Sequence, residues 1–220
     1  MNDDTTIKID LPINGPLLIN NSPGSRIPSH KTCRLGQKYA IDLCPLYSPT
    51  QLTDGRDWQL WCSLVKIQHC GGYGADIHSI AKGSVALVGN GCLDPKFVNV
   101  LLGFLRIKRN SKFKSDISAL LGNYIIIDHG PFCSLYAHLK NNSLNVITGQ
   151  KVKHRQTIAK VGSTGNSSFP HLHFQIMTSS NLETAQGIPF VFNTYKHLKN
   201  KDWLAAQDTV PQNGQVVSFK

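Results

Sequence analysis

Two histidines separated by one residue lie in the segment His171-Leu-His-Phe-Gln-Ile-Met177. Successive side chains of a β-strand point to opposite faces. The segment therefore predicts a strand with its apolar residues toward the core and His171, His173 and Gln175 on the other face. The two imidazoles would lie roughly 7 Å apart, two strand rises. At that separation one imidazole can hold a metal ion while the other works beside it, although a solvated sheet face with two unremarkable histidines fits this segment equally well.

Two further segments place a polar side chain in an apolar strand. In Ser134-Leu-Tyr-Ala-His-Leu139 the alternation predicts Tyr136 and His138 on the outer face and the intervening apolar residues on the core face. Asp42 lies among apolar neighbours in the strand segment 38–43. A carboxylate in such a strand is costly unless it is paired or binds a metal. Asp42 is therefore a candidate metal ligand.

Short β-type segments follow one another through much of the chain, and they predict an all-β fold of the sandwich or barrel-like kind. We expect a hairpin at 76–88 that turns at Lys82-Gly83, and one short helix within 97–121 that a basic run interrupts. The expected strands are Lys38–Leu43, Asn123–Asp128, Ser134–Leu139, Leu144–Ile147, Thr157–Val161 and His171–Met177.

The composition narrows the function classes only partly. Lys and Arg number 23 against 13 Asp and Glu, a formal net charge of +10 that favours contact with polyanions without choosing among them. Six cysteines form no Cys-x-x-Cys pair, which argues against a cysteine zinc knuckle and leaves buried thiols or disulfides open. The sequence predicts no transmembrane segment, and no signal peptide is visible.

Taken in order, a set of motifs resembles the signature of the lysostaphin-like zinc endopeptidases, which are peptidoglycan hydrolases. The similarity covers about residues 20–177. The family's fold implies antiparallel sheets that form a groove, with irregular loops. The motifs are Asn21–His30, Gly36–Asp42, Gly122–Gly130, Tyr136–Leu139, Gly149–Val152, Ile158–Ser168 and Pro170–Phe174.

The resemblance implies that His30, Asp42 and His173 are zinc ligands and that His138 and His171 are unligated catalytic histidines. Three protein ligands leave one zinc position open for water, as in a catalytic site. The family usually spaces its first histidine four residues before the aspartate, but here that position is Lys38. The nearest upstream histidine, His30, lies twelve residues before Asp42, and a loop residue can reach a strand from there.

The resemblance also implies a function and an organisation for the chain. We expect a zinc metalloendopeptidase that hydrolyses peptide bonds in peptidoglycan, acts in the periplasm or outside the cell, and binds peptidoglycan peptides rather than nucleic acid. The cleaved bond remains open between a glycine bridge, a D-alanine link and a stem-peptide bond. We expect an extended lead-in at 1–29, the peptidase domain at 30–177, and a C-terminal tail at 178–220 packed on that domain.

Three other interpretations compete with this one. A catalytically silent relative would bind cell wall and regulate another hydrolase, but such a protein loses ligands, whereas this sequence keeps a candidate for every one. A lipoyl- or biotinyl-type carrier needs a lysine at a hairpin tip flanked by Met or Asp, and none is present. A nucleic-acid binder is suggested by charge alone, without the clustered aromatic residues that stack on bases.

Overall fold

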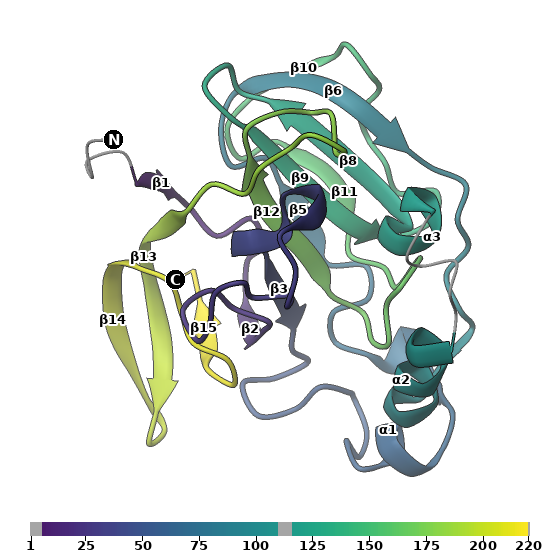
Figure 1. The fold of residues 1–220 in the computed structure, drawn as a ribbon. Helices are drawn as coiled ribbons and strands as arrows, with labels where there is room; N and C mark the ends of the chain where they lie inside the picture. The colour runs from purple at the N-terminus through teal and green to yellow at the C-terminus, as the bar shows by residue number, and fades with distance from the viewer. Residues whose placement is uncertain (1–5, 110–115, 220) are drawn as a thin grey trace.

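The computed structural model describes residues 6–109 and 116–219, and its main feature is one long, mixed sheet (Figure 1). The order of its strands is β1-β13-β15-β2-β3-β12-β9-β8-β6-β10, with β14 paired to β13. Every pairing is antiparallel except that of β1 with β13. The all-β prediction is confirmed. The strands are β1 Ile7–Ile9, β2 Pro16–Asn20, β3 Ile41–Pro45, β6 Gly83–Gly89, β8 Asn123–Asp128, β9 Cys133–Leu139, β10 Lys151–Val152, β12 Leu172–Met177, β13 Phe190–Lys199, β14 Asp202–Thr209 and β15 Val216–Ser218.

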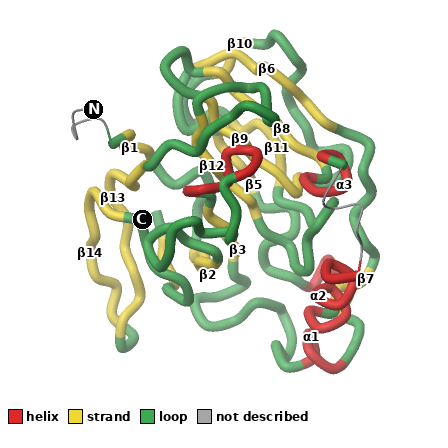
Figure 2. Tube along the Cα trace, in the orientation of Figure 1, coloured by secondary structure: helices red, strands yellow, loops and turns green. Residues whose placement is uncertain are grey.

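Two small sheets and a few short helices complete the described part of the chain. Strand β5 (Asp76–His78) pairs with β11 (Thr157–Lys160), and β4 (Val65–Lys66) pairs with β7 (Phe97–Val98). The helices are α1 Gln59–Cys62, α2 Val100–Arg109, α3 Ile117–Leu121 and the 3-10 turns η1 Arg34–Tyr39 and η2 Ile67–His69. Helices α1 and α2 lie together at one side of the molecule (Figure 2). No helix of the described residues is long and apolar enough to cross a membrane.

In the stretch 97–121, where one helix was expected, the described residues form two. Its first residues form β7, α2 follows, and α3 begins after Asp116, whose carboxylate accepts a hydrogen bond from the Ala119 amide at 3.1 Å. Most of the basic run, residues 110–114, lies outside the described residues.

The hairpin predicted at 76–88 is wrong. Strand β5 pairs with β11, and β6 pairs with β8 and β10. The turn signal at Lys82-Gly83 is overridden because Ser79, directly after β5, continues to hydrogen-bond the backbone of Arg155 and Gln156. Gly83 instead begins β6, where a side chain would meet the Asp128 carbonyl at 2.5 Å.

Two strand predictions need correction. Residues 144–147 form no strand, because Asn145 makes a single backbone bond to β11 and the Ile147 amide is bound by the Gln150 side chain. The strand predicted at 38–43 begins at Ile41, since residues 34–39 form the turn η1. The limits of the predicted domain, 30–177, stay a prediction. Strands β1, β2 and β13–β15, which lie outside those limits, belong to the same sheet as β3 and β12.

Both faces of the central strands are covered. The apolar residues of β12 that were predicted to face the core belong to the larger apolar cluster, in which Phe174 is fully buried. Tyr136 of β9 packs against Phe174 with ring centroids 5.4 Å apart, and its hydroxyl accepts a hydrogen bond from the Ile80 amide. Leu135 and Ala137 belong to a second cluster on the opposite face. The prediction that Tyr136 faces outward is therefore wrong, because the outer face of this sheet is itself packed.

Candidate metal centre and its histidines

The centre of the site is a cross-strand pair. Antiparallel strands β12 and β3 place His173 directly opposite Asp42. The His173 Nδ1 atom lies 3.1 Å from Asp42 Oδ1, and both side chains are almost fully buried. The register of two strands, set by their apolar neighbours in the core, thus brings together donors that are far apart in the sequence.

His30 completes the group from the loop between β2 and η1. Its Nε2 atom lies 3.1 Å from Asp42 Oδ1, and its ring meets that of His173 edge-on at 4.7 Å between centroids. The loop is held by the Ser29 amide, which donates to the Lys38 carbonyl, and by a 3.0 Å contact between the Ser29 hydroxyl and His30 Nδ1. The long His30–Asp42 spacing is therefore no obstacle to their meeting.

The three donor atoms of His30, Asp42 and His173 all lie within 4.8 Å of one another. Two imidazole nitrogens and one carboxylate oxygen are the ligands that zinc takes in catalytic sites, where three protein ligands leave a position for water. The donor set therefore fits a zinc ion.

A buried amide fixes which nitrogen of His173 faces the other donors. Gln175 donates from Nε2 to the Leu35 carbonyl at 2.7 Å, so its Oε1 is the atom that accepts from His173 Nε2 at 3.1 Å. His173 then carries its proton on Nε2, and its Nδ1 is free to bind a metal. Gly36, at φ 75°, lets this loop approach, since a Cβ there would lie 2.8 Å from the Gln175 amide nitrogen.

His138 reaches the same face through a β-bulge. Tyr124 pairs with Ala137 and Asn123 pairs with Leu139, so His138 is the extra residue, and its φ is 62°. Without the bulge His138 would point to the same side as Tyr136, into the larger core. With it, the His138 ring lies 4.7 Å from that of His171 and 5.9 Å from that of His173.

The backbone orients the two histidines outside the donor group. His138 Nδ1 donates to the Thr164 carbonyl at 2.9 Å, and His171 Nδ1 donates to the Phe169 carbonyl at 2.7 Å. Each imidazole therefore has its Nε2 free as an acceptor, and His171 Nε2 lies 3.8 Å from Asp42 Oδ1. The structure thus brings together all five residues singled out in the sequence.

Burial and the neighbouring charges set the ionisation of the site. Burial alone would raise the pKa of Asp42, but its close contacts with His30, His171 and His173 outweigh burial and hold that pKa well below its ordinary value. Burial lowers the pKa of His138 well below its usual range, and His171 and His173 lower it further. Burial also lowers the pKa of His171, against the opposing effect of Asp42. At neutral pH the site therefore holds an ionised carboxylate at Asp42 beside neutral imidazoles at His138 and His171.

The site opens into a cavity of about 310 Å³ whose lining includes His30, Asp42, His138, His171 and His173. A substrate in this cavity would contact both the donor group and the two remaining histidines.

Two polar partners of the site did not stand out in the sequence. The Asn21 amide donates to Asp42 Oδ2 at 2.7 Å from a loop that carries no periodic signal. Gln175 lies on the predicted face, but its role depends on the distant Leu35 carbonyl. His129, which directly follows β8, contacts the Lys82 carbonyl and the Ser134 hydroxyl.

Part of the chain that holds the site is similar in sequence to known proteins. Residues 107–187, the part that holds His138, His171 and His173, match the model of peptidase family M23. The chain is 36% identical over 67 residues to the peptidoglycan DD-endopeptidase ShyC of Vibrio cholerae, covering 30% of this chain and 15% of that protein. It is 50% identical over 58 residues to the glycyl-glycine endopeptidase ALE-1 of Staphylococcus capitis, covering 26% of this chain and 16% of that protein.

The matched parts thus amount to about a sixth of the relatives' own length. Among solved structures, the catalytic domain of lysostaphin from Staphylococcus simulans is 27% identical, covers 56% of this chain and 80% of that chain, and has a TM-score of 0.33. Residues 107–187 thus carry the sequence pattern of peptidase family M23, and the relatives named above are endopeptidases that share part of it.

Proposed function

We propose that this chain is a zinc-dependent endopeptidase that hydrolyses peptide bonds in peptidoglycan. The observation that carries the proposal is the convergence of His30, Asp42 and His173 on one point, with His138 and His171 directly beside it. The names of the relatives, which act on peptidoglycan or on glycyl-glycine bonds, support the substrate class. Such a substrate implies action in the periplasm or outside the cell.

Zinc bound by His30 Nε2, Asp42 Oδ1 and His173 Nδ1 would polarise the scissile carbonyl and lower the pKa of a bound water to about 7. The chain's own residues supply the proton steps. His138 and His171 each present an unprotonated Nε2, so either can accept the proton of the attacking water and later return it to the leaving amine. As a protonated imidazolium, the same side chain would stabilise the negative oxygen of the tetrahedral intermediate.

Single alanine variants separate metal binding from chemistry. We expect His173→Ala to lose zinc, and His138→Ala and His171→Ala to keep zinc while losing about 10²-fold or more in turnover. The control is His154, a half-exposed residue that pairs with Asp10 away from the site. His154→Ala should change neither the zinc content nor the turnover. Zinc retained in His173→Ala but lost in His171→Ala would show that the two roles are assigned the wrong way round.

The products of digestion test the reaction itself. Digested peptidoglycan should carry new amino termini and no new reducing sugar ends, because water at the proposed site attacks an amide carbonyl and breaks a peptide bond, not a glycosidic bond. New reducing ends without new amines would contradict the proposal. Neither product, on walls of several compositions, would favour the catalytically silent relative.

A further inference from the structure

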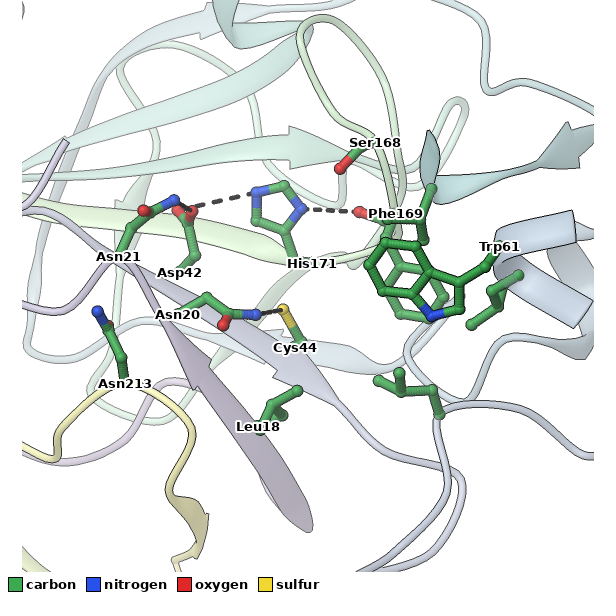
Figure 3. A pocket seen from close by; sticks show the side chains of 13 residues that line it. Leu18, Asn20, Asn21, Asp42, Cys44, Trp61, Ser168, Phe169, His171 and Asn213 are labelled. Carbon is green, nitrogen blue, oxygen red and sulfur yellow. Dashed lines mark hydrogen bonds and ion pairs between the residues drawn. The ribbon is translucent and has the colours of Figure 1, made fainter. Parts of the chain in front are cut away.

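A second cavity lies next to the metal centre and shares residues with it. Its volume is about 460 Å³, and Asn21, Asp42, Ser168 and His171 line both cavities (Figure 3). A peptide bond held between Asp42 and His171 would therefore place a neighbouring residue of the substrate in this second cavity.

The walls of this cavity are mostly apolar and come from three parts of the chain. Strand β2 contributes Leu18, and the turn before β12 contributes Phe169. The segment between β3 and β8 contributes Leu52, Leu60, Trp61 and Val100, three of which pack in one apolar cluster with Phe169. Leu60 is fully buried and anchors α1, whereas Trp61 keeps 57% of its surface exposed at the edge of the cavity (Figure 3).

The charge of the lining limits what the cavity can take. Among the thirteen described residues that line the cavity, Asp42 is the single carboxylate, and none is Lys, Arg or Glu. The Asp42 carboxylate is already bound by the Asn21 amide and the neighbouring histidines. A charged substrate side chain would lose its hydration here without gaining an ion-pair partner.

We infer that this cavity is a specificity subsite for an uncharged aliphatic side chain next to the scissile bond. The inference rests on the proposed function and adds to it, because a substrate with glycine on both sides of the bond has no group to fill the cavity. Covering the exposed Trp61 and the apolar wall with a hydrocarbon side chain removes apolar surface from water. We therefore expect the cavity to prefer a peptide bond in which one of the two joined residues carries an aliphatic side chain to a bond between two glycines.

Binding measured without turnover tests the subsite separately from the reaction. The protein is zinc-loaded His138→Ala, because His138 does not line this cavity. The probes are pentaglycine capped at both ends and two analogues with a four-carbon aliphatic side chain, one on each side of the central amide. By calorimetry, we expect one analogue to bind roughly tenfold or more tightly than pentaglycine, the size typical for a hydrocarbon group in an apolar pocket.

A filling variant and a matched control complete the test. Leu18 lies outside the apolar core clusters, so Leu18→Trp fills the cavity, and it should remove the preference for the aliphatic analogue. Leu204→Trp, on the partly exposed strand β14, should leave that preference unchanged. Thermal melting checks that both variants fold.

Equal binding of all three peptides by the zinc-loaded protein, or a preference that survives in Leu18→Trp, would overturn the subsite. Neither result would depend on whether wild-type protein cleaves peptidoglycan. Failure of cleavage with the preference intact would refute the proposed reaction and leave the subsite supported.

Discussion

Replacement of Gln175 by leucine tests whether a residue that touches no metal controls the metal site. The side chain is 1% exposed and joins His173 Nε2 to the Leu35 carbonyl. Leucine has a similar volume but no polar atoms, so the change leaves unpaired the buried donor of His173 and the partly buried carbonyl of Leu35. Each unpaired group costs about 1–3 kcal/mol, so the metal-free protein should lose roughly 2–6 kcal/mol of stability.

The effect on zinc is distinct from the effect on folding. Without Gln175 Oε1, nothing fixes the His173 proton on Nε2 or the orientation of the ring. Loss of such an outer hydrogen bond typically weakens metal binding about 10- to 100-fold, which is about 1.4–2.8 kcal/mol. Competition against a chromophoric chelator measures the zinc affinity, and chemical denaturation of the chelated protein measures the folding term.

Gln175→Glu is the discriminating variant. A carboxylate still accepts from His173 Nε2 but cannot donate to the Leu35 carbonyl, so it should bind zinc more tightly than Gln175→Leu. The reasoning fails if Gln175→Leu binds zinc as tightly as wild type. It also fails if the glutamate variant is as weak as the leucine variant, because the acceptor would then be irrelevant.

Three further changes probe the framework. Gly122→Ala should destabilise the protein more than Gly214→Ala. Both glycines have a positive φ, which costs an alanine about 1–2 kcal/mol, but only at Gly122 would the new Cβ collide, 2.4 Å from Thr164 Oγ1. Equal losses of stability in urea denaturation would contradict this. Tyr136→Phe should lower the free energy of unfolding by about 1–3 kcal/mol, since the buried Ile80 amide loses its acceptor, and an unchanged value would refute the role of that bond. Burial lowers the pKa of His129 in the folded state. Below about pH 6.5 the unfolded state therefore binds more protons than the folded state. The free energy of unfolding should fall as the pH drops from about 6.5 to the lowered pKa. His129→Gln should flatten that pH dependence of the unfolding free energy, and an unaltered slope would count against it.

The alternation rule predicted part of this site well and part of it wrongly. It assigned the core face of β12 correctly, because that strand is regular and buries its apolar residues in one cluster. On β9 it grouped Tyr136 with His138, since it could not foresee the bulge that separates them. The resemblance singled out His138, and its catalytic role stays a prediction, whereas the alternation rule placed it among the outward residues for a reason that does not hold.

Long-range pairing explains most of the remaining errors. The turn at Lys82-Gly83 is a genuine local signal, but the partners of β5 and β6 are β11, β8 and β10, which lie tens of residues away. The contact of Gln175 with Leu35 and that of His30 with Asp42 likewise depend on loops that no periodicity describes. The sequence could identify the residue types of the site, whereas their hydrogen bonds depended on the tertiary fold.

The order of strands has a consequence for how the chain folds during synthesis. Strand β15 lies between β13 and β2, so β2 has only β3 as a neighbour until residues 216–218 have been made. The donors of the metal centre, by contrast, are all present once residue 173 has left the ribosome. Pairings between distant segments form slowly and leave strand edges open to wrong partners in the meantime. A nascent chain could therefore gather His30, Asp42 and His173 while the edge of β2 is still unprotected, and zinc captured at that stage would hold β3 and β12 together as the rest of the sheet arrives.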